Sequence, residues 1–128
     1  NENLVEAAIG VGTGTRFYQY FDTKKNLESA VFDNAHFLGG RLIAIVLRQD
    51  EELVLVLRDI FSIEEYFYEI KRGFSEFAVY SNAVISVTAA DATHIEIRYY
   101  KGIDAEEISE LIRVPAMPSY ETTGVLFG

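Results

Sequence analysis

Residues 41–61, RLIAIVLRQDEELVLVLRDIF, decide between a sheet and a helical fold, because both periodicities are present in them. Read as strands, segments 42–47 and 53–57 are rich in β-branched residues and form a hairpin through the polar residues 49–52. Read as a helix, the stretch carries one apolar stripe, made of Leu42, Ile45, Val46, Leu53, Val56, Leu57 and Ile60. The segments on either side must settle the choice.

The preceding segments favour helices. Residues 1–9 place four apolar residues at helical spacing after an asparagine cap. In residues 23–38, Thr23 is a suitable N-cap, Gly39 and Gly40 end the pattern, and the apolar residues recur every three or four positions. These apolar residues are Leu4, Val5, Ala8 and Ile9 in the first segment, and Leu27, Ala30, Val31, Ala35 and Leu38 in the second.

Residues 62–78 have the clearest helical pattern. Ser62 and Glu65 form a capping box, and an aromatic-rich face carries Ile63, Tyr66, Phe67, Ile70, Phe74 and Phe77. Residues 104–112 predict one more helix, in which Asp104 caps and Glu107 closes the box.

Residues 82–101 favour strands instead. Apolar and polar residues alternate on both sides of a turn at residues 91–93, which is a hairpin signature. The alternating apolar residues are Ala83, Ile85, Val87, Ile95, Ile97 and Tyr99.

Composition limits the functional classes. The chain has 128 residues, of which 49% are hydrophobic and 13% aromatic, enough to bury a core. It contains no cysteine, which excludes disulfides, thiolate metal sites and cysteine nucleophiles. Its apolar runs are far shorter than the roughly 20 residues of a membrane helix, and no signal peptide is recognisable. We therefore expect a cytoplasmic protein that does not contact membranes.

The net charge of −9 is unevenly distributed. Residues 1–48 balance, with Arg16, Lys24, Lys25, Arg41 and Arg48 against Glu2, Glu6, Asp22, Glu28 and Asp33. The whole deficit therefore lies in residues 49–128. Residues 1–48 are neutral overall and carry clustered cations, whereas residues 49–128 are acidic. Contact with phosphate is therefore expected only in residues 1–48.

Enzymatic activity finds little support. His36 and His94 lack metal-ligand spacing, and Ser62, Ser75 and Ser86 lack a nucleophile motif. We expect neither an enzyme nor a metal or cofactor.

Residues 10–31, GVGTGTRFYQYFDTKKNLESAV, resemble the TetR family of transcriptional regulators. The family pattern is roughly Gly-Val-Ser-x-Gly-Thr, an apolar residue, Tyr-x-Tyr-Phe, then x-Ser/Thr-Lys-x-x-Leu-x-x-Ala. It is matched here by Tyr18, Tyr20, Phe21, Thr23, Lys24, Leu27 and Ala30. Weaker similarities lie in residues 47–57 and 102–112.

The resemblance implies a DNA-binding surface. Thr13 and Thr15 would begin the recognition helix, Tyr18, Tyr20 and Lys24 would contact phosphates, and Phe21 would pack the motif against the core. Arg16 would read a guanine through its two acceptors. With so few cations, two copies on a palindrome are expected.

The first hypothesis is therefore an all-α TetR-like repressor, with a partial helix-turn-helix region in residues 1–38 and a ligand-binding and dimerisation region in residues 39–128. It would be a homodimer on double-stranded DNA, released by a small apolar effector. The effector would contact the aromatic stripe of Tyr66, Phe67, Ile70, Phe74 and Phe77.

The alternative hypothesis follows local pattern alone and gives an α+β ferredoxin-like sandwich. Its strands are 15–21, 41–48, 52–60, 83–89 and 94–100, and its helices are 23–38, 62–78 and 104–112. Such a domain would be an acidic binding or assembly module that does not bind DNA.

Overall fold

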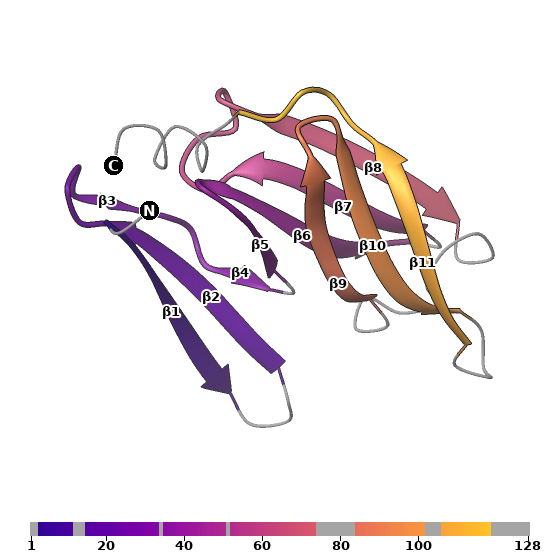
Figure 1. Cartoon of the computed structure of the whole chain (residues 1–128). Coiled ribbons are helices and arrows are strands. Elements are labelled where there is room, and N and C mark those ends of the chain that lie inside the picture. Colours follow the sequence, from indigo (N-terminus) through magenta and orange to yellow (C-terminus); the bar gives the residue numbers. More distant parts are fainter. Residues whose placement is uncertain are drawn as a thin grey trace.

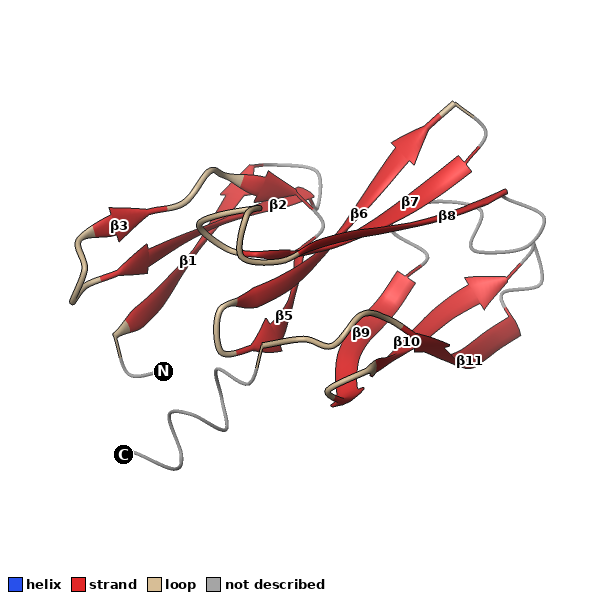
Figure 2. Ribbon diagram, turned by 90° about the horizontal axis from the view of Figure 1, so that it is seen from above, coloured by secondary structure: helices blue, strands red, loops and turns tan. Residues whose placement is uncertain are grey.

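Three antiparallel sheets make up the described part of the protein. The structure, a computed structural model, describes residues 3–11, 15–33, 35–50, 52–73, 84–101 and 106–118, and these contain strands and no helix (Figures 1 and 2). The first sheet contains β1 (Leu4–Val11), β2 (Thr15–Asp22), β3 (Leu27–Glu28) and β4 (Phe32–Asp33). The central sheet contains β5 (Ala35–Gly39), β6 (Leu42–Gln49), β7 (Glu52–Asp59) and β8 (Phe67–Gly73). The third contains β9 (Val84–Asp91), β10 (His94–Lys101) and β11 (Glu106–Arg113).

The β6–β7 hairpin is the centre of the fold. Its ladder runs without a break from Leu42 opposite Asp59 to Gln49 opposite Glu52. Successive side chains of a strand point to opposite faces, and here both faces are covered (Figure 1). A strand buried on both faces needs apolar residues at every position, so the sequence shows continuous apolar runs rather than alternation.

Two apolar cores lie on opposite faces of the central sheet. The first core joins it to the first sheet and contains Tyr20, Phe32, Ile43, Ile45, Val54, Val56 and Ile60. The second core joins it to the third sheet and includes Leu42, Ala44, Val46, Leu53, Leu55, Leu57, Val87, Ile95, Ile97 and Ile112. The architecture is therefore three stacked β layers (Figure 2).

Aspartate side chains close three of the turns. Asp22 Oδ1 accepts from the main-chain amides of Lys24 and Lys25, each at 3.0 Å. Asp59 Oδ2 accepts from the amides of Phe61 and Ser62, at 2.9 and 3.0 Å. Asp91 Oδ1 accepts from the amide of Thr93 at 2.8 Å. Aspartate favours such turns because its short side chain reaches the amides two and three residues on.

Three turns of the described residues contain left-handed backbone, and one of them is the β6–β7 turn, where Asp50 has φ of 54°. Asn26 has φ of 56° just before β3, and asparagine tolerates this region better than other residues with a Cβ. Gly40, between β5 and β6, has φ of 57°, where glycine carries no steric cost.

The all-α prediction is wrong, and so is the TetR resemblance on which it rested, because the described residues contain no helix. The α+β alternative is not matched either, although its strands coincide with β2, β6, β7, β9 and β10. Its three helices are wrong: the described residues of 23–38 contain a turn, β3, β4 and most of β5, residues 67–73 of the second form β8, and residues 106–112 of the third lie in β11. The expected helix at residues 1–9 is β1.

The two predicted regions, 1–38 and 39–128, divide the chain within β5, whose strand pairs with β6. This division stays a prediction. Among the described residues, no helix is both long and apolar enough to cross a membrane.

Candidate functional site

The residues predicted to bind DNA lie in a strand and a turn. Thr15 and Arg16 begin β2, and their side chains lie outside the described part of the structure, as does all of Thr13. Tyr18 and Tyr20 lie on the face of β2 that packs toward the first core, and Tyr20 is 1% exposed. Among the described residues no recognition helix carries any of them, so the helix-turn-helix hypothesis is wrong.

Lys24 does not begin a helix. It lies in the 23–26 turn, exposed, and its main-chain amide donates to Asp22. The helix start predicted at Thr23 is therefore wrong: the amides of Lys24 and Lys25 donate to Asp22 and cannot offer an anion the open first turn of a helix.

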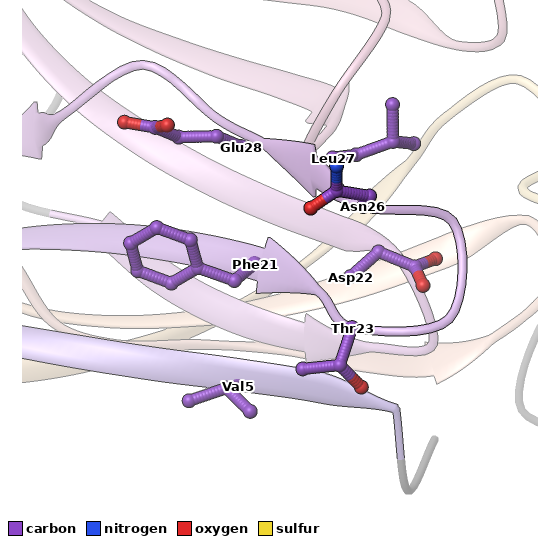
Figure 3. A pocket seen from close by; sticks show the side chains of 7 residues that line it. All are labelled: Val5, Phe21, Asp22, Thr23, Asn26, Leu27 and Glu28. Atoms are coloured by element: carbon purple, nitrogen blue, oxygen red, sulfur yellow. The ribbon is translucent and has the colours of Figure 1, made fainter.

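The outer face of the first sheet is hollowed at this turn. A groove of about 460 Å³ is bordered by β1, β2, the 23–26 turn and β3 (Figure 3). Val5 lies opposite Phe21 in the β1–β2 ladder, and Phe21 lies opposite Glu28 of β3. Leu27 and Val5 keep 37% and 46% of their surfaces exposed. The groove is therefore half apolar and opens beside an edge strand.

Strand β1 is that edge. Its ladder with β2 is regular over eight residues, from Leu4 opposite Asp22 to Val11 opposite Thr15. The amide of Thr23 donates to the carbonyl of Asn3 at 2.8 Å, so Asn3 points its main-chain groups toward β2. Because these groups alternate along a strand, the amides at positions 4, 6, 8 and 10 point away from β2.

β1 differs from the other edge strands in charge and regularity. Its sequence, LVEAAIGV, has one charged residue, Glu6. β8 and β11 each carry several charges, and β5 and β9 have irregular ladders and lie beside each other. A long edge with few charges is a template for pairing with another strand.

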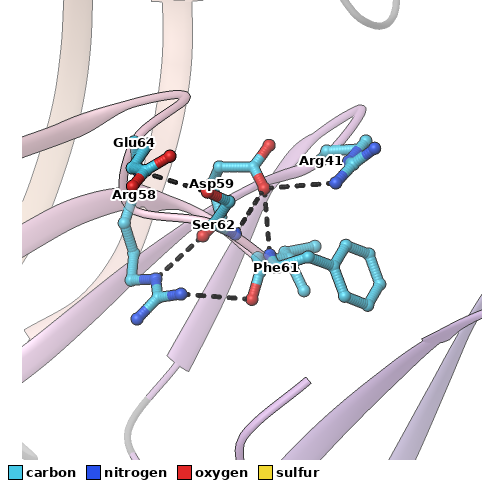
Figure 4. Close-up of polar contacts among 7 residues, drawn as sticks. Arg41, Arg58, Asp59, Phe61, Ser62 and Glu64 are labelled. Atoms are coloured by element: carbon cyan, nitrogen blue, oxygen red, sulfur yellow. Dashed lines mark hydrogen bonds and ion pairs between the residues drawn. The ribbon is translucent and has the colours of Figure 1, made fainter. Parts of the chain in front are cut away.

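A polar cluster holds the turn after β7 (Figure 4). Asp59 is fully buried, and besides the two turn amides it faces Arg41, whose Nη2 lies 3.4 Å from Oδ2. The Arg41 guanidinium carbon lies 4.9 Å from the centroid of the Phe61 ring. Arg58 donates from Nε to the Asp59 carbonyl at 2.8 Å. These contacts fix the turn that leaves β7 at the border of the first core, so the role of the cluster is structural.

Burial lowers the pKa of the Arg58 guanidinium from its ordinary value, and the charge of Asp59 partly offsets that effect. Its guanidinium carbon lies 5.2 Å from the ring centroid of Phe32, which belongs to β4. Arg58 therefore links the first and central sheets.

The predicted effector stripe is divided between two faces. Tyr66 is buried in the second core and donates its hydroxyl to the carbonyl of Pro115 at 2.7 Å. Ile70 packs against the same core, whereas Phe67 is 48% exposed. Phe74 and Phe77 lie outside the described residues. A strand places every second residue on one face, so Tyr66, Tyr68 and Ile70 lie together and Phe67 does not.

The described part of the chain offers no metal centre. No cluster of three or more His, Asp or Glu side chains there could hold a metal ion. His94 Nδ1 contacts Asp91 Oδ1 at 2.9 Å in an exposed turn, and this contact, together with the Thr93 amide, lowers the pKa of Asp91. Burial lowers the pKa of His36.

The sequence reasoning missed Glu6 and Phe37, which border a second hollow between β1, β2 and β5. A period-two reading of residues 4–8 would have put Leu4 and Glu6 on one face.

Comparison of the chain with protein families, curated proteins and solved structures finds no significant match.

Proposed function

We propose that this chain is an acidic all-β assembly module that pairs with a second copy of itself along β1. The observation that carries the proposal is the regular, almost uncharged β1 edge, whose alternate amides point away from β2. An added strand would satisfy those amides and extend the first sheet.

The charge pattern of β1 favours a second copy as the added strand. In an antiparallel pair centred on Ala7, Glu6 of one chain lies opposite Ala8 of the other, so the two carboxylates do not face each other. Small residues at the centre, Ala7 and Ala8, allow close approach. Val5, nearly half exposed beside the groove, lies opposite position 9 of the partner and loses apolar surface to water.

Hydrogen exchange tests this pairing residue by residue. In dilute solution, the amides of Glu6 and Ala8 should exchange rapidly, because they point to the open edge, whereas those of Val5 and Ala7 should be protected by β2. At high protein concentration, the amides of Glu6 and Ala8 should become protected. Rapid exchange at both positions across the whole concentration range would contradict the proposal.

Sedimentation velocity provides the matched test by substitution. Val5→Lys should raise the dimer dissociation constant at least about tenfold, because lysine on an edge strand opposes pairing. Leu27→Lys is the control: it adds the same charge to the same groove on β3, away from the β1 edge, and should leave the constant nearly unchanged. Equal effects would place the interface elsewhere.

A further inference from the structure

A second hollow opens between the inner face of β1–β2 and β5. It has a volume of about 190 Å³ and is lined by Leu4, Glu6, Tyr20 and Phe37. Phe37 is 45% exposed, and its ring stacks on that of Tyr20, with centroids 6.3 Å apart and planes inclined by 23°. The hollow thus combines one carboxylate with an open aromatic face.

The carboxylate is held in place. The Tyr20 hydroxyl donates to Glu6 Oε2 at 2.6 Å. Among the described residues Glu6 makes this one side-chain hydrogen bond, which leaves Oε1 for a second donor. Burial, followed by the bond to Glu6, raises the pKa of Tyr20, so the phenol stays protonated and remains a donor to Glu6.

This combination selects the class of ligand. Hard inorganic cations need several oxygen ligands, and here one carboxylate is available. A flat organic cation instead stacks on an aromatic face and donates to a carboxylate with the same group. The chain already uses this chemistry internally, since Arg58 lies over Phe32 and Arg41 over Phe61.

From these contacts we infer that the Glu6–Tyr20–Phe37 hollow binds an alkylguanidinium group, the arginine side chain of a partner protein. The guanidinium would donate to Glu6 Oε1 and lie against Phe37, with its alkyl stem along Leu4. The net charge of −9 attracts basic partners over longer range.

Nuclear magnetic resonance titration with ethylguanidinium chloride tests the site, with ethylurea as the neutral probe of the same shape. Ethylguanidinium should shift the Phe37 ring and Glu6 side-chain signals in a saturable way, and ethylurea should bind at least tenfold more weakly. Equal shifts with both probes would overturn the inference, because the charge would then have no role.

Two substitutions locate the binding groups. Glu6→Gln removes the charge but retains an acceptor for Tyr20, and Phe37→Leu removes the aromatic face at a half-exposed position; each should weaken ethylguanidinium binding about tenfold. Glu28→Gln is the control, because it removes the same charge from the outer face of the sheet. An equal loss of ethylguanidinium affinity with Glu28→Gln would show that only the net charge of the protein matters, and would overturn the assignment of the site to Glu6.

The source of the guanidinium is tested with capped arginine, carrying acetyl and methylamide groups, against free arginine. Capped arginine should bind at least as tightly, because a protein side chain brings no free carboxylate toward the acidic chain. Binding by free arginine alone would overturn the assignment to a partner protein.

Discussion

Asp59 is a fully buried acid whose oxygen holds a turn and an arginine together. Replacing it by alanine leaves the amides of Phe61 and Ser62 without this acceptor and Arg41 without this carboxylate. We expect Asp59→Ala to lower the free energy of unfolding by about 3 kcal/mol, measured by urea denaturation. Asp91→Ala, which removes the acceptor of the Thr93 amide from an exposed turn, should cost clearly less, because water can replace the lost bonds there. Equal losses would contradict a role for burial.

His36 gives the second prediction at the residue scale. Burial lowers its pKa from the ordinary value of 6.5, so below that pH the unfolded chain takes up a proton that the folded chain does not. Stability should therefore fall as the pH drops below 6.5, until the pH passes the lowered pKa. His36→Gln should make the unfolding free energy less dependent on pH between 7.5 and 5. The control is His94→Gln, which keeps His36 and should therefore keep the loss of stability that His36 causes on acidification. An unchanged pH profile in His36→Gln would contradict the prediction.

Strand β7 has a core on each face, so its neighbouring residues should matter equally. Val54 packs into the first core and Leu55 into the second, and both are at most 1% exposed. We expect Val54→Ala and Leu55→Ala each to destabilise the protein by about 2–4 kcal/mol in urea denaturation. Leu47→Ala, at a position 38% exposed, should cost less than about 1 kcal/mol. A small effect at Val54 would show that the first sheet does not cover this face.

The same two-sided burial explains why the sequence could be read as a helix. Strands with both faces covered show no alternation, and the apolar runs 42–47 and 53–57 therefore match either period. The polar turn at 91–93 and the alternation around it did predict β9 and β10. In β11 the alternation is hidden by Glu110, which shares a face with Ile108 and Ile112 and accepts a hydrogen bond from Tyr99 at 3.2 Å. The inward position of the Glu110 carboxylate is explained by Tyr99 of the neighbouring strand β10, which the sequence of β11 alone does not reveal.

Turn chemistry also resembled helix capping. Ser62 accepts from the amide of Glu64 through its side chain, and its carbonyl accepts from the amide of Glu65, as in a helix start. The chain then enters β8, because alternate positions 66, 68 and 70 pack into the second core. In residues 27–32 the helical pattern expected Val31 inside, but Val31 is 51% exposed and Phe32 is buried. Of the candidate site, the sequence indicated neither the β1 edge nor the Glu6 hollow, since both depend on strand pairing, and its pattern presented the 23–26 turn as a helix start.

At the scale of the whole molecule, a charge of −9 acts oppositely on the two proposed interactions. Two copies repel each other, while a guanidinium is attracted. Raising the salt concentration from 0.01 to 0.1 M shortens the screening length from about 30 to about 10 Å. The dimer should therefore tighten, roughly threefold or more, and ethylguanidinium binding should weaken. Sedimentation and nuclear magnetic resonance titration at both salt concentrations measure the two constants on one sample. A dimer that weakens with salt would indicate an interface made by opposite charges rather than by the nearly uncharged β1. Guanidinium binding that does not change with salt would contradict a contact with the Glu6 carboxylate.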